Sequence, residues 1–311
     1  MKTTELCDGI TLVTAFFPIG RGQWSGESRR SDDKYFTYFA HWARIRNDLI
    51  VYTTPENEVR VRAIRASYGR ENTIIHTVPR LSDIDVDLFK LMHQVGERFP
   101  EFSLYPDKPE VNNPTYDFAM YAKFWCLAQA SSEVSTNKMA WIDFGFDHGG
   151  EYYKDSYWFD REWNYHRPSG NVSLFQLREF PTDPIFDCVR RTDTYIQGNC
   201  IELDTIYARQ FHKDVRNQYE HLLRCGLLDD DQIVLLMCHL EKPNEYCCLP
   251  STWFSMFKDY NDEDKIPETE ESKTLLPEFM VTGARTRWYW TKRCLRFVKK
   301  DFWHLVRRYP L

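Results

Sequence analysis

Two groups of acidic residues have the types and spacing that general acid–base chemistry requires. Asp229, Asp230 and Asp231 are adjacent and precede an apolar run. Neighbouring carboxylates repel one another, which can raise the pKa of one of them, and a carboxylate that deprotonates a hydroxyl group is a simple general base. Asp231 and Asp230 are therefore candidate catalytic residues. The alternative is a helix N-cap, because acids at a helix start favour the helix dipole.

The second group, Asp143 and Asp147, follows an apolar segment in the order Trp-Ile-Asp-Phe-Gly-Phe-Asp. Mg²⁺ and Mn²⁺ prefer carboxylate oxygens, and a divalent cation can neutralise the leaving phosphates of a nucleotide diphosphate. These two residues are candidate metal ligands. A turn-capping role for Asp143 is the alternative, and basic side chains can neutralise phosphates without a metal.

Three basic residues are candidate phosphate ligands. Lys123 lies within an otherwise apolar helical pattern, and Arg29 and Arg30 lie in the loop after the first predicted strand. Arginine binds phosphate in a bidentate manner. A solvated surface position is the alternative for all three.

Strand and helix patterns alternate through the first half of the chain. The apolar runs predict strands, and the spacing of apolar residues between them predicts helices. The predicted strands are residues 10–17, 49–53, 73–78 and 138–144, and the predicted helices are residues 34–46, 56–68, 85–99 and 116–130. This order predicts an α/β fold with a mostly parallel sheet flanked by helices.

Ligands of such sheets bind beyond the carboxyl ends of the strands. The loops after Phe17, Tyr52 and Ile142 are therefore expected to form the site. The second half is less regular: residues 151–169 are an aromatic, charged insertion, residues 196–203 a strand with a glycine turn, and residues 203–225 and 229–240 helices.

Composition limits the classes of function. The net charge of −6 argues against a nucleic-acid partner. The nine cysteines include no C-x-x-C pair, which favours reduced thiols in a cytosolic protein. We find neither a signal-peptide pattern nor an apolar run long enough to cross a membrane. We predict a catalytic domain at 1–260, an acidic linker at 261–284 and a tail at 285–311.

The tail combines positive charge with a helical apolar face. It carries nine lysines and arginines against one aspartate, and Leu295, Val298, Phe302, Leu305 and Tyr309 follow helical spacing. A basic amphipathic helix with aromatic residues is typical of a segment that lies in an anionic membrane surface. Packing against the domain and RNA binding are the alternatives.

The order of several segments resembles the HtrL/YibB family of bacterial proteins. These segments are TLVTAFFPIGRGQW, YFTYFAHWARIRNDLIVYT, NPTYDFAMYAKFWCLAQA, WIDFG and DDDQ, and the resemblance runs from about Thr11 to about Trp253. The family is found among genes for lipopolysaccharide and capsule synthesis and is similar to GT-A glycosyltransferases. The resemblance implies a GT-A-like, Rossmann-like domain that transfers a sugar onto surface glycans.

The resemblance also implies roles for individual residues. Thr14, Ala15, Phe16 and Phe17 would contact the nucleotide base, and Gly198 and Asn199 would lie near the donor or acceptor sugar. Tyr52 is a candidate donor-binding residue because of its place at a strand end, not because of the resemblance. Asp231 would be the base. Asp143 would begin a DxD-like motif, but Gly145 stands where the second acid is expected. Dependence on Mn²⁺ or Mg²⁺ and metal-independent transfer therefore both stay open.

The expected function is the transfer of a sugar from a nucleotide-sugar donor. UDP-linked hexoses, including UDP-galactofuranose, are the first donors to consider, and inversion at the anomeric carbon is the expected stereochemistry. The expected acceptor is a lipid-linked saccharide or an oligosaccharide, at the cytoplasmic face of the inner membrane. Two other functions are weighed: a sugar nucleotidyltransferase, which needs a glycine-rich basic loop after the first strand, and a non-catalytic membrane-associated protein of glycan assembly.

Overall fold

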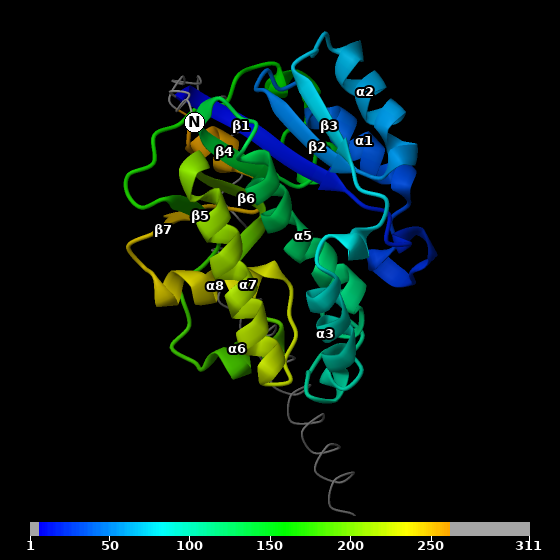
Figure 1. The fold of residues 1–311 in the computed structure, drawn as a ribbon, viewed down its shortest axis with the longest axis vertical. Helices are drawn as coiled ribbons and strands as arrows, with labels where there is room; N and C mark the ends of the chain where they lie inside the picture. The colour runs from blue at the N-terminus through cyan, green and yellow to red at the C-terminus, as the bar shows by residue number, and fades with distance from the viewer. Residues whose placement is uncertain (1–5, 262–311) are drawn as a thin grey trace, which may run out of the picture. The chain divides into compact units, whose positions relative to one another are not determined.

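The computed structural model describes residues 6–261, which contain a seven-stranded sheet with helices on both faces (Figure 1). The strand order is β3-β2-β1-β4-β6-β5-β7. The strands are β1 (Cys7–Phe16), β2 (Leu49–Thr53), β3 (Thr73–Thr77), β4 (Thr136–Ile142), β5 (Val172–Gln176), β6 (Ile196–Asp204) and β7 (Tyr246–Pro250). The fold is a Rossmann-like α/β fold, as the alternation of strands and helices predicts.

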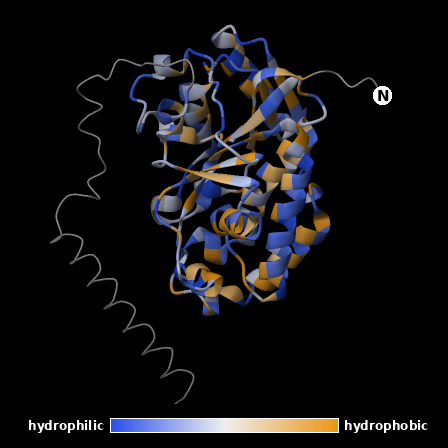
Figure 2. Ribbon diagram, turned by 90° about the vertical axis from the view of Figure 1, so that its left-hand side faces the viewer, coloured by the Kyte–Doolittle hydropathy of each residue, from blue (hydrophilic) through white to orange (hydrophobic). Residues whose placement is uncertain are grey.

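The helices divide between the two faces of the sheet. They are α1 (Asp32–Trp42), α2 (Glu58–Ser67), α3 (Val86–Gly96), α4 (Pro109–Asn112), α5 (Pro114–Ala130), α6 (Ile185–Arg191), α7 (Ala208–Arg224), α8 (Asp231–Glu241) and α9 (Met256–Asp259). Helices α3, α5, α6, α7 and α8 share one apolar core with the sheet, and α1 and α2 share the other. Figure 2 shows hydrophilic and hydrophobic residues alternating along these helices, as expected where one helix face is buried.

The sheet is mixed because one strand is reversed. Strands β1 to β4 pair in parallel, and β5 pairs in parallel with β7, but β6 is antiparallel to both β4 and β5. The carboxyl end of β4 therefore lies beside the amino end of β6, where the backbone N–H of Asp143 donates to the carbonyl of Asn199 at 2.8 Å. This reversal brings the Gly198 region to the same sheet edge as Asp143.

Two predictions for the second half are corrected, and several of its elements were not predicted. Residues 196–203 contain no glycine turn, because Gly198 lies within the continuous strand β6. The helix predicted from residue 229 begins at Asp231, and the side chain of Asp230 caps it by accepting from the backbone N–H of Gln232 at 3.0 Å. Strands β5 and β7 and helix α6 were not expected.

The aromatic insertion at 151–169 is part of the core. Tyr153, Phe159 and Trp163 are buried against the face that α1 covers, and Phe257 of α9 packs edge-on against Trp163. The side chain of Asn47 ties this segment to β1, since its amide donates to the carbonyls of both Ile10 and Trp163. The aromatic residues here fill a core.

The described residues contain no helix that is long and apolar enough to cross a membrane. None of the eight cysteines among them forms a disulfide, as the sequence predicts for reduced thiols. The described body spans the predicted catalytic domain, 1–260, apart from its first residues. The predicted acidic linker at 261–284 and basic tail at 285–311 lie outside the described residues, except for residue 261.

Candidate functional site

A cavity of about 520 Å³ opens at the carboxyl ends of β1 and β4. Its wall includes Phe16 and Phe17 from β1 and the loop after it, Asp143 after β4, Gly198 on β6 and Asp231 at the start of α8. This is the edge where ligands of open α/β sheets bind, and the volume lies within the usual range for ligand sites. Asp143 and Asp231, which are far apart in the sequence, thus line one cavity.

Lys123 of α5 joins these two acids. Its ammonium nitrogen lies 2.6 Å from Asp231 Oδ2 and 3.5 Å from Asp143 Oδ1, and it donates to the carbonyl of Gly198 at 2.8 Å. The side chain is 1% exposed. Burial lowers the pKa of Lys123, but Asp143 and Asp231 outweigh it, so the pKa lies above its ordinary value. The lysine is a fixed, buried positive charge.

Gly198 makes room for the carboxylate that Lys123 holds. A Cβ atom at position 198 would lie 1.9 Å from Asp231 Oδ2 and 2.6 Å from its Cγ. Such distances are far inside van der Waals contact. Only glycine lets β6 approach α8 closely enough for the Gly198 carbonyl and the Asp231 carboxylate to bind the same ammonium group.

Three further acids near Asp231 are also buried. Burial, together with neighbouring acids, raises the pKa of Asp230, Asp229 and Asp117 well above the usual range for a carboxyl group. Neither oxygen of Asp117 has a hydrogen-bond partner among the described residues. Burial also raises the pKa of Asp231, and Lys123 opposes that shift. Asp231 is therefore the member of this group that a basic side chain contacts directly.

The loop after β1 supplies a cationic end to the cavity. Arg21 and Arg30 both line it. The Arg21 guanidinium lies 4.9 Å from the ring centre of Trp24 and 5.6 Å from that of Tyr116, and it donates to the hydroxyl oxygen of Tyr35. The Ser28 carbonyl also accepts from Arg21 Nε and Nη2, at 3.3 and 3.2 Å, and no carboxylate of the described residues forms an ion pair with this arginine. The remaining N–H groups of Nη1 and Nη2 are suited to phosphate.

The sequence reasoning missed Arg21. The sequence held a signal for it, because Arg21 stands between Gly20 and Gly22 in the loop after the first predicted strand. The structure shows that Gly20 has a left-handed backbone (φ 72°). Arg29, which was predicted instead, does not line the cavity. Its Nε donates to the carbonyl of Gly22 at 2.9 Å, so it closes the loop on itself.

The loop after β4 has a strained backbone. Asp147 and His148 have φ values of 57° and 46°, in the left-handed region that only a few per cent of non-glycine residues adopt. The Asp147 carboxylate accepts from the backbone N–H groups of Tyr152 and Tyr153 at 2.6 and 3.0 Å. These bonds hold the loop, and His148 and Glu151 then line the cavity, bonded to one another at 2.7 Å.

The acids of this loop do not fit a metal held by protein ligands alone. Asp143 Oδ1 accepts from Trp141 Nε1 at 2.6 Å and lies near the Lys123 ammonium, while Asp147 lies outside the cavity wall. Within residues 6–261 no three acidic, histidine or cysteine side chains are grouped as metal ligands. At position 145 a Cβ would lie 3.0 Å from the Tyr35 ring, which accounts for glycine in place of a second acid.

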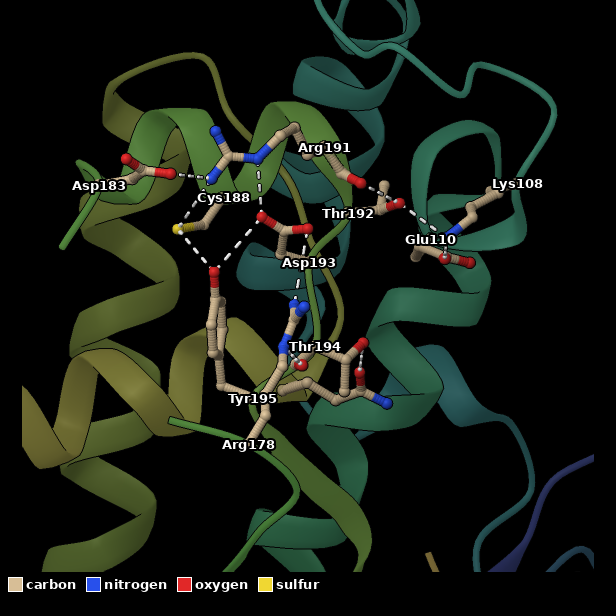
Figure 3. A network of polar contacts seen from close by, with 11 residues as sticks. Lys108, Glu110, Arg178, Asp183, Cys188, Arg191, Thr192, Asp193, Thr194 and Tyr195 are labelled. Carbon is tan, nitrogen blue, oxygen red and sulfur yellow. Dashed lines mark hydrogen bonds and ion pairs between the residues drawn. The ribbon is translucent and has the colours of Figure 1, made fainter. Parts of the chain in front are cut away.

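A polar network surrounds the turn after α6 (Figure 3). Lys108 lies 3.2 Å from Glu110, which lines the cavity, and donates to Thr192 Oγ1 at 2.7 Å. Asp193, in the same turn, accepts from Arg191 Nε at 2.7 Å. Thr194 donates to Gln232 Oε1 at 2.6 Å. The network connects the turn after α6 to the start of α8 and so fixes the rim beside Asp231.

Most of the residues predicted for the site line one cavity. Those in its wall are Ala15, Phe16, Phe17, Arg30, Lys123, Asp143, Gly145, Gly198, Asn199, Asp230 and Asp231. Those outside it are Thr14, Arg29, Tyr52 and Asp147. Thr14 is fully buried within β1, and Tyr52 packs against the rings of His76 and Trp125. Of the three loops expected at this edge, the one after Tyr52 contributes nothing to the wall.

Comparisons with known proteins place the chain in a family. One similar solved structure is 4-diphosphocytidyl-2C-methyl-D-erythritol synthase from Anaerococcus prevotii DSM 20548, which is 10% identical, with a TM-score of 0.34 over 78% of this chain and 87% of that chain. Another is a cytidylyltransferase from Leptospira borgpetersenii serovar Hardjo-bovis, which is 11% identical, with a TM-score of 0.31 over 82% of this chain and 78% of that chain. Likenesses this weak carry nothing about function.

The sequence matches are stronger. Protein HtrL of Escherichia coli strain K12 is 27% identical over 274 residues, covering 80% of this chain and 91% of that protein. The family model described as "Bacterial protein of unknown function (HtrL_YibB)" matches residues 8–262. Since that match spans most of the chain, the protein belongs to the HtrL/YibB family.

Proposed function

We propose that this protein is a glycosyltransferase that moves a sugar from a nucleotide diphosphate sugar to a hydroxyl group of a saccharide. The observation that carries the proposal is the cavity itself. It combines a cationic end at Arg21 and Arg30 with a buried lysine that bridges Asp143 and Asp231. The first suits a diphosphate, and the second suits a site where charge develops and a proton moves.

The proposed donor lies along the carboxyl ends of β1 and β4. Arg21 and Arg30 bind the diphosphate, because their guanidinium groups can donate to several phosphate oxygens. Ala15, Phe16 and Phe17 border the nucleoside. Lys123 lies beyond them, and its positive charge favours the negative charge that develops on the departing diphosphate.

Asp231 is the proposed base for the acceptor hydroxyl. Its Oδ2 accepts from Lys123, and Asp231 lines the cavity in which the acceptor hydroxyl would bind. A base is most effective when its pKa is near the working pH, and burial raises the pKa of Asp231 while Lys123 opposes that shift. Because a single base on the acceptor side suits direct displacement, the proposed reaction inverts the anomeric centre.

The finer identity of the substrates rests on the family context rather than on a residue. UDP-linked hexoses, including UDP-galactofuranose, are the proposed donors. A lipid-linked saccharide or an oligosaccharide of lipopolysaccharide, O-antigen or capsule is the proposed acceptor, and the cytoplasmic face of the inner membrane is the proposed location. Mn²⁺ or Mg²⁺ dependence stays a prediction, since the protein side chains alone do not fit a metal and a nucleotide can bring one.

The test is a hydrolysis and transfer screen of nucleotide sugars, with and without Mn²⁺ or Mg²⁺, on the full chain. Release of UDP from a UDP-sugar, lost in Asp231→Asn, is the expected result. If the protein instead makes a nucleotide sugar and pyrophosphate from a nucleoside triphosphate and a sugar phosphate, it is a nucleotidyltransferase. If no nucleotide binds or reacts, a non-catalytic role replaces the proposal.

A further inference from the structure

One large aromatic side chain at the cavity mouth is left without cover. Trp253 lines the cavity, yet 44% of its surface is exposed. It lies between β7 and α9, in a chain segment that reaches the β6 side of the cavity. Exposing a large apolar ring costs free energy relative to burying it, so an exposed ring at a ligand site calls for an explanation.

The backbone on either side of Trp253 is fixed. The carbonyl of Trp253 accepts from Asn199 Nδ2 at 2.6 Å, and the next residue, Phe254, packs edge-on against Phe146 and His148. The neighbouring turn is closed by Ser255 Oγ, which accepts from the N–H of Thr252 at 3.2 Å. The indole is therefore presented by a rigid segment. A rigid exposed aromatic ring binds with little loss of conformational entropy.

Trp253 lies away from the proposed phosphate site. Arg21 belongs to the loop after β1, whereas Asn199, which holds Trp253, is on β6, and β4 lies between these strands. Neighbouring strands are about 4.8 Å apart, so the two ends of the cavity are separated by roughly 10 Å along the sheet edge. Asp231 packs against Gly198 of β6, the residue before Asn199, so Asp231 and Trp253 both lie at the β6 side of the cavity. A ligand on Trp253 thus lies at the end of the cavity away from the diphosphate.

Polar side chains that line the same cavity, one of which packs against Phe254 beside Trp253, are suited to hydroxyl groups. His148 and Glu151 line the same mouth, and their side chains are 33% and 62% exposed, so both can bind a ligand while bonded to each other. An aromatic ring flanked by such groups matches a sugar, which has an apolar face of C–H groups and hydroxyl groups at its edge.

We propose that Trp253 is the stacking platform of an acceptor subsite that takes a pyranose or furanose ring of a saccharide, with Glu151 and His148 bound to its hydroxyl groups. The inference rests on the proposed function and deepens it by naming where the acceptor binds. Stacking there places an acceptor hydroxyl on the side of the cavity where Asp231 lies, as transfer to that hydroxyl requires.

The first test is kinetic and compares Trp253→Ala, Trp253→Phe and the control Phe186→Ala in the full chain. Phe186 is 52% exposed on α6 and does not line the cavity. With lactose, maltose and methyl hexosides as acceptors, the ratio of transfer to donor hydrolysis should fall about tenfold in Trp253→Ala, and by less in Trp253→Phe. An unchanged ratio in Trp253→Ala overturns the inference and leaves the proposed function standing.

The second test does not depend on turnover. The protein is labelled with 5-fluorotryptophan, and the ¹⁹F resonance of Trp253 is assigned by its loss in Trp253→Phe. Addition of the same saccharides should shift that resonance in the wild type. If UDP-sugars are not consumed but the resonance shifts, the transferase proposal fails and the saccharide site stands. If UDP binds and no saccharide shifts the resonance, the site proposal fails.

Discussion

Replacing Gly198 by alanine places a methyl group where the Asp231 carboxylate lies. The new Cβ would be 1.9 Å from Oδ2, whereas ordinary contact begins at 3.4 Å, so the carboxylate must retreat by about 1.5 Å. The contact between Asp231 and Lys123 is 2.6 Å, and good N–H···O bonds end near 3.2 Å. A retreat of this size therefore breaks the buried ion pair.

Breaking a buried ion pair costs about 3–5 kcal/mol. For a domain of this size, a loss of roughly 3 kcal/mol lowers Tm by about 6–12 °C. Misplacing a catalytic group by about 1 Å can cost roughly a hundredfold in rate. We expect Gly198→Ala to show both losses, measured by thermal unfolding and by UDP release from the best donor. Gly22→Ala is the matched control, because its Cβ meets no atom closer than 3.6 Å.

A double-mutant cycle tests the cause. The three atoms nearest to the added Cβ all belong to the Asp231 carboxyl group, which Asp231→Ala removes. In the Asp231→Ala background, Gly198→Ala should therefore cost little further stability, because its clash is gone. Additive losses from the two substitutions would refute the reasoning and show that the glycine is required for something other than the Asp231 contact.

Three further predictions follow from the buried charges and the cationic end. Lys123→Met leaves Asp231 without its partner, and burial then holds the folded-state pKa of Asp231 above its unfolded value. We expect the substitution to lower the free energy of unfolding by about 3–5 kcal/mol at pH 8. This loss should shrink as the pH falls toward roughly 4, because the protonated carboxyl group needs no partner. Urea unfolding at several pH values measures this, and a loss independent of pH would contradict it. Burial, with Asp230 and Asp229 beside it, raises the pKa of Asp117, so the wild type takes up a proton on folding and loses stability as the pH rises from about 4 to the folded-state pKa. Asp117→Asn removes this dependence, and its stability relative to the wild type should improve by about 1.4 kcal/mol per pH unit across that window; equal pH profiles would show that Asp117 is ionised in the fold. Arg21→Ala should weaken UDP binding about 10–100-fold in calorimetry, whereas Arg29→Ala should change it little, because Arg21 lines the cavity and Arg29 does not. Equal effects would place the diphosphate elsewhere.

Local patterns in the sequence were sufficient for the first half of the fold. The apolar runs at 49–53 and 73–78 became β2 and β3 with bounds within one residue. All five residues of β2 are buried, as expected for a central parallel strand, and the partly exposed edge strand β3 keeps the β-branched residues typical of strands. The carboxyl-edge rule then selected the loops after Phe17 and Ile142, which do line the cavity.

Features that depend on contacts between distant parts of the chain could not be predicted from local sequence patterns. No local pattern reports that β6 runs antiparallel, and β5 and β7, five residues each, are paired through partners distant in the chain. The same holds within the site. The helix pattern of α5 marks Lys123 as unusual but cannot show that it meets Asp231, 108 residues later. Gly198 reads as a turn residue in sequence, whereas its role is to leave space for a carboxylate on another element.

The central claim is that a nucleotide diphosphate sugar binds in this cavity with its diphosphate at Arg21 and Arg30 and its sugar toward Asp143 and Asp231. A crystal structure of the protein with bound UDP tests it most directly. We expect diphosphate oxygens within hydrogen-bonding distance of both arginines, beside the carboxyl end of β1. UDP bound on another surface, or UDP bound in this cavity with its diphosphate away from both arginines, would rule out this binding mode.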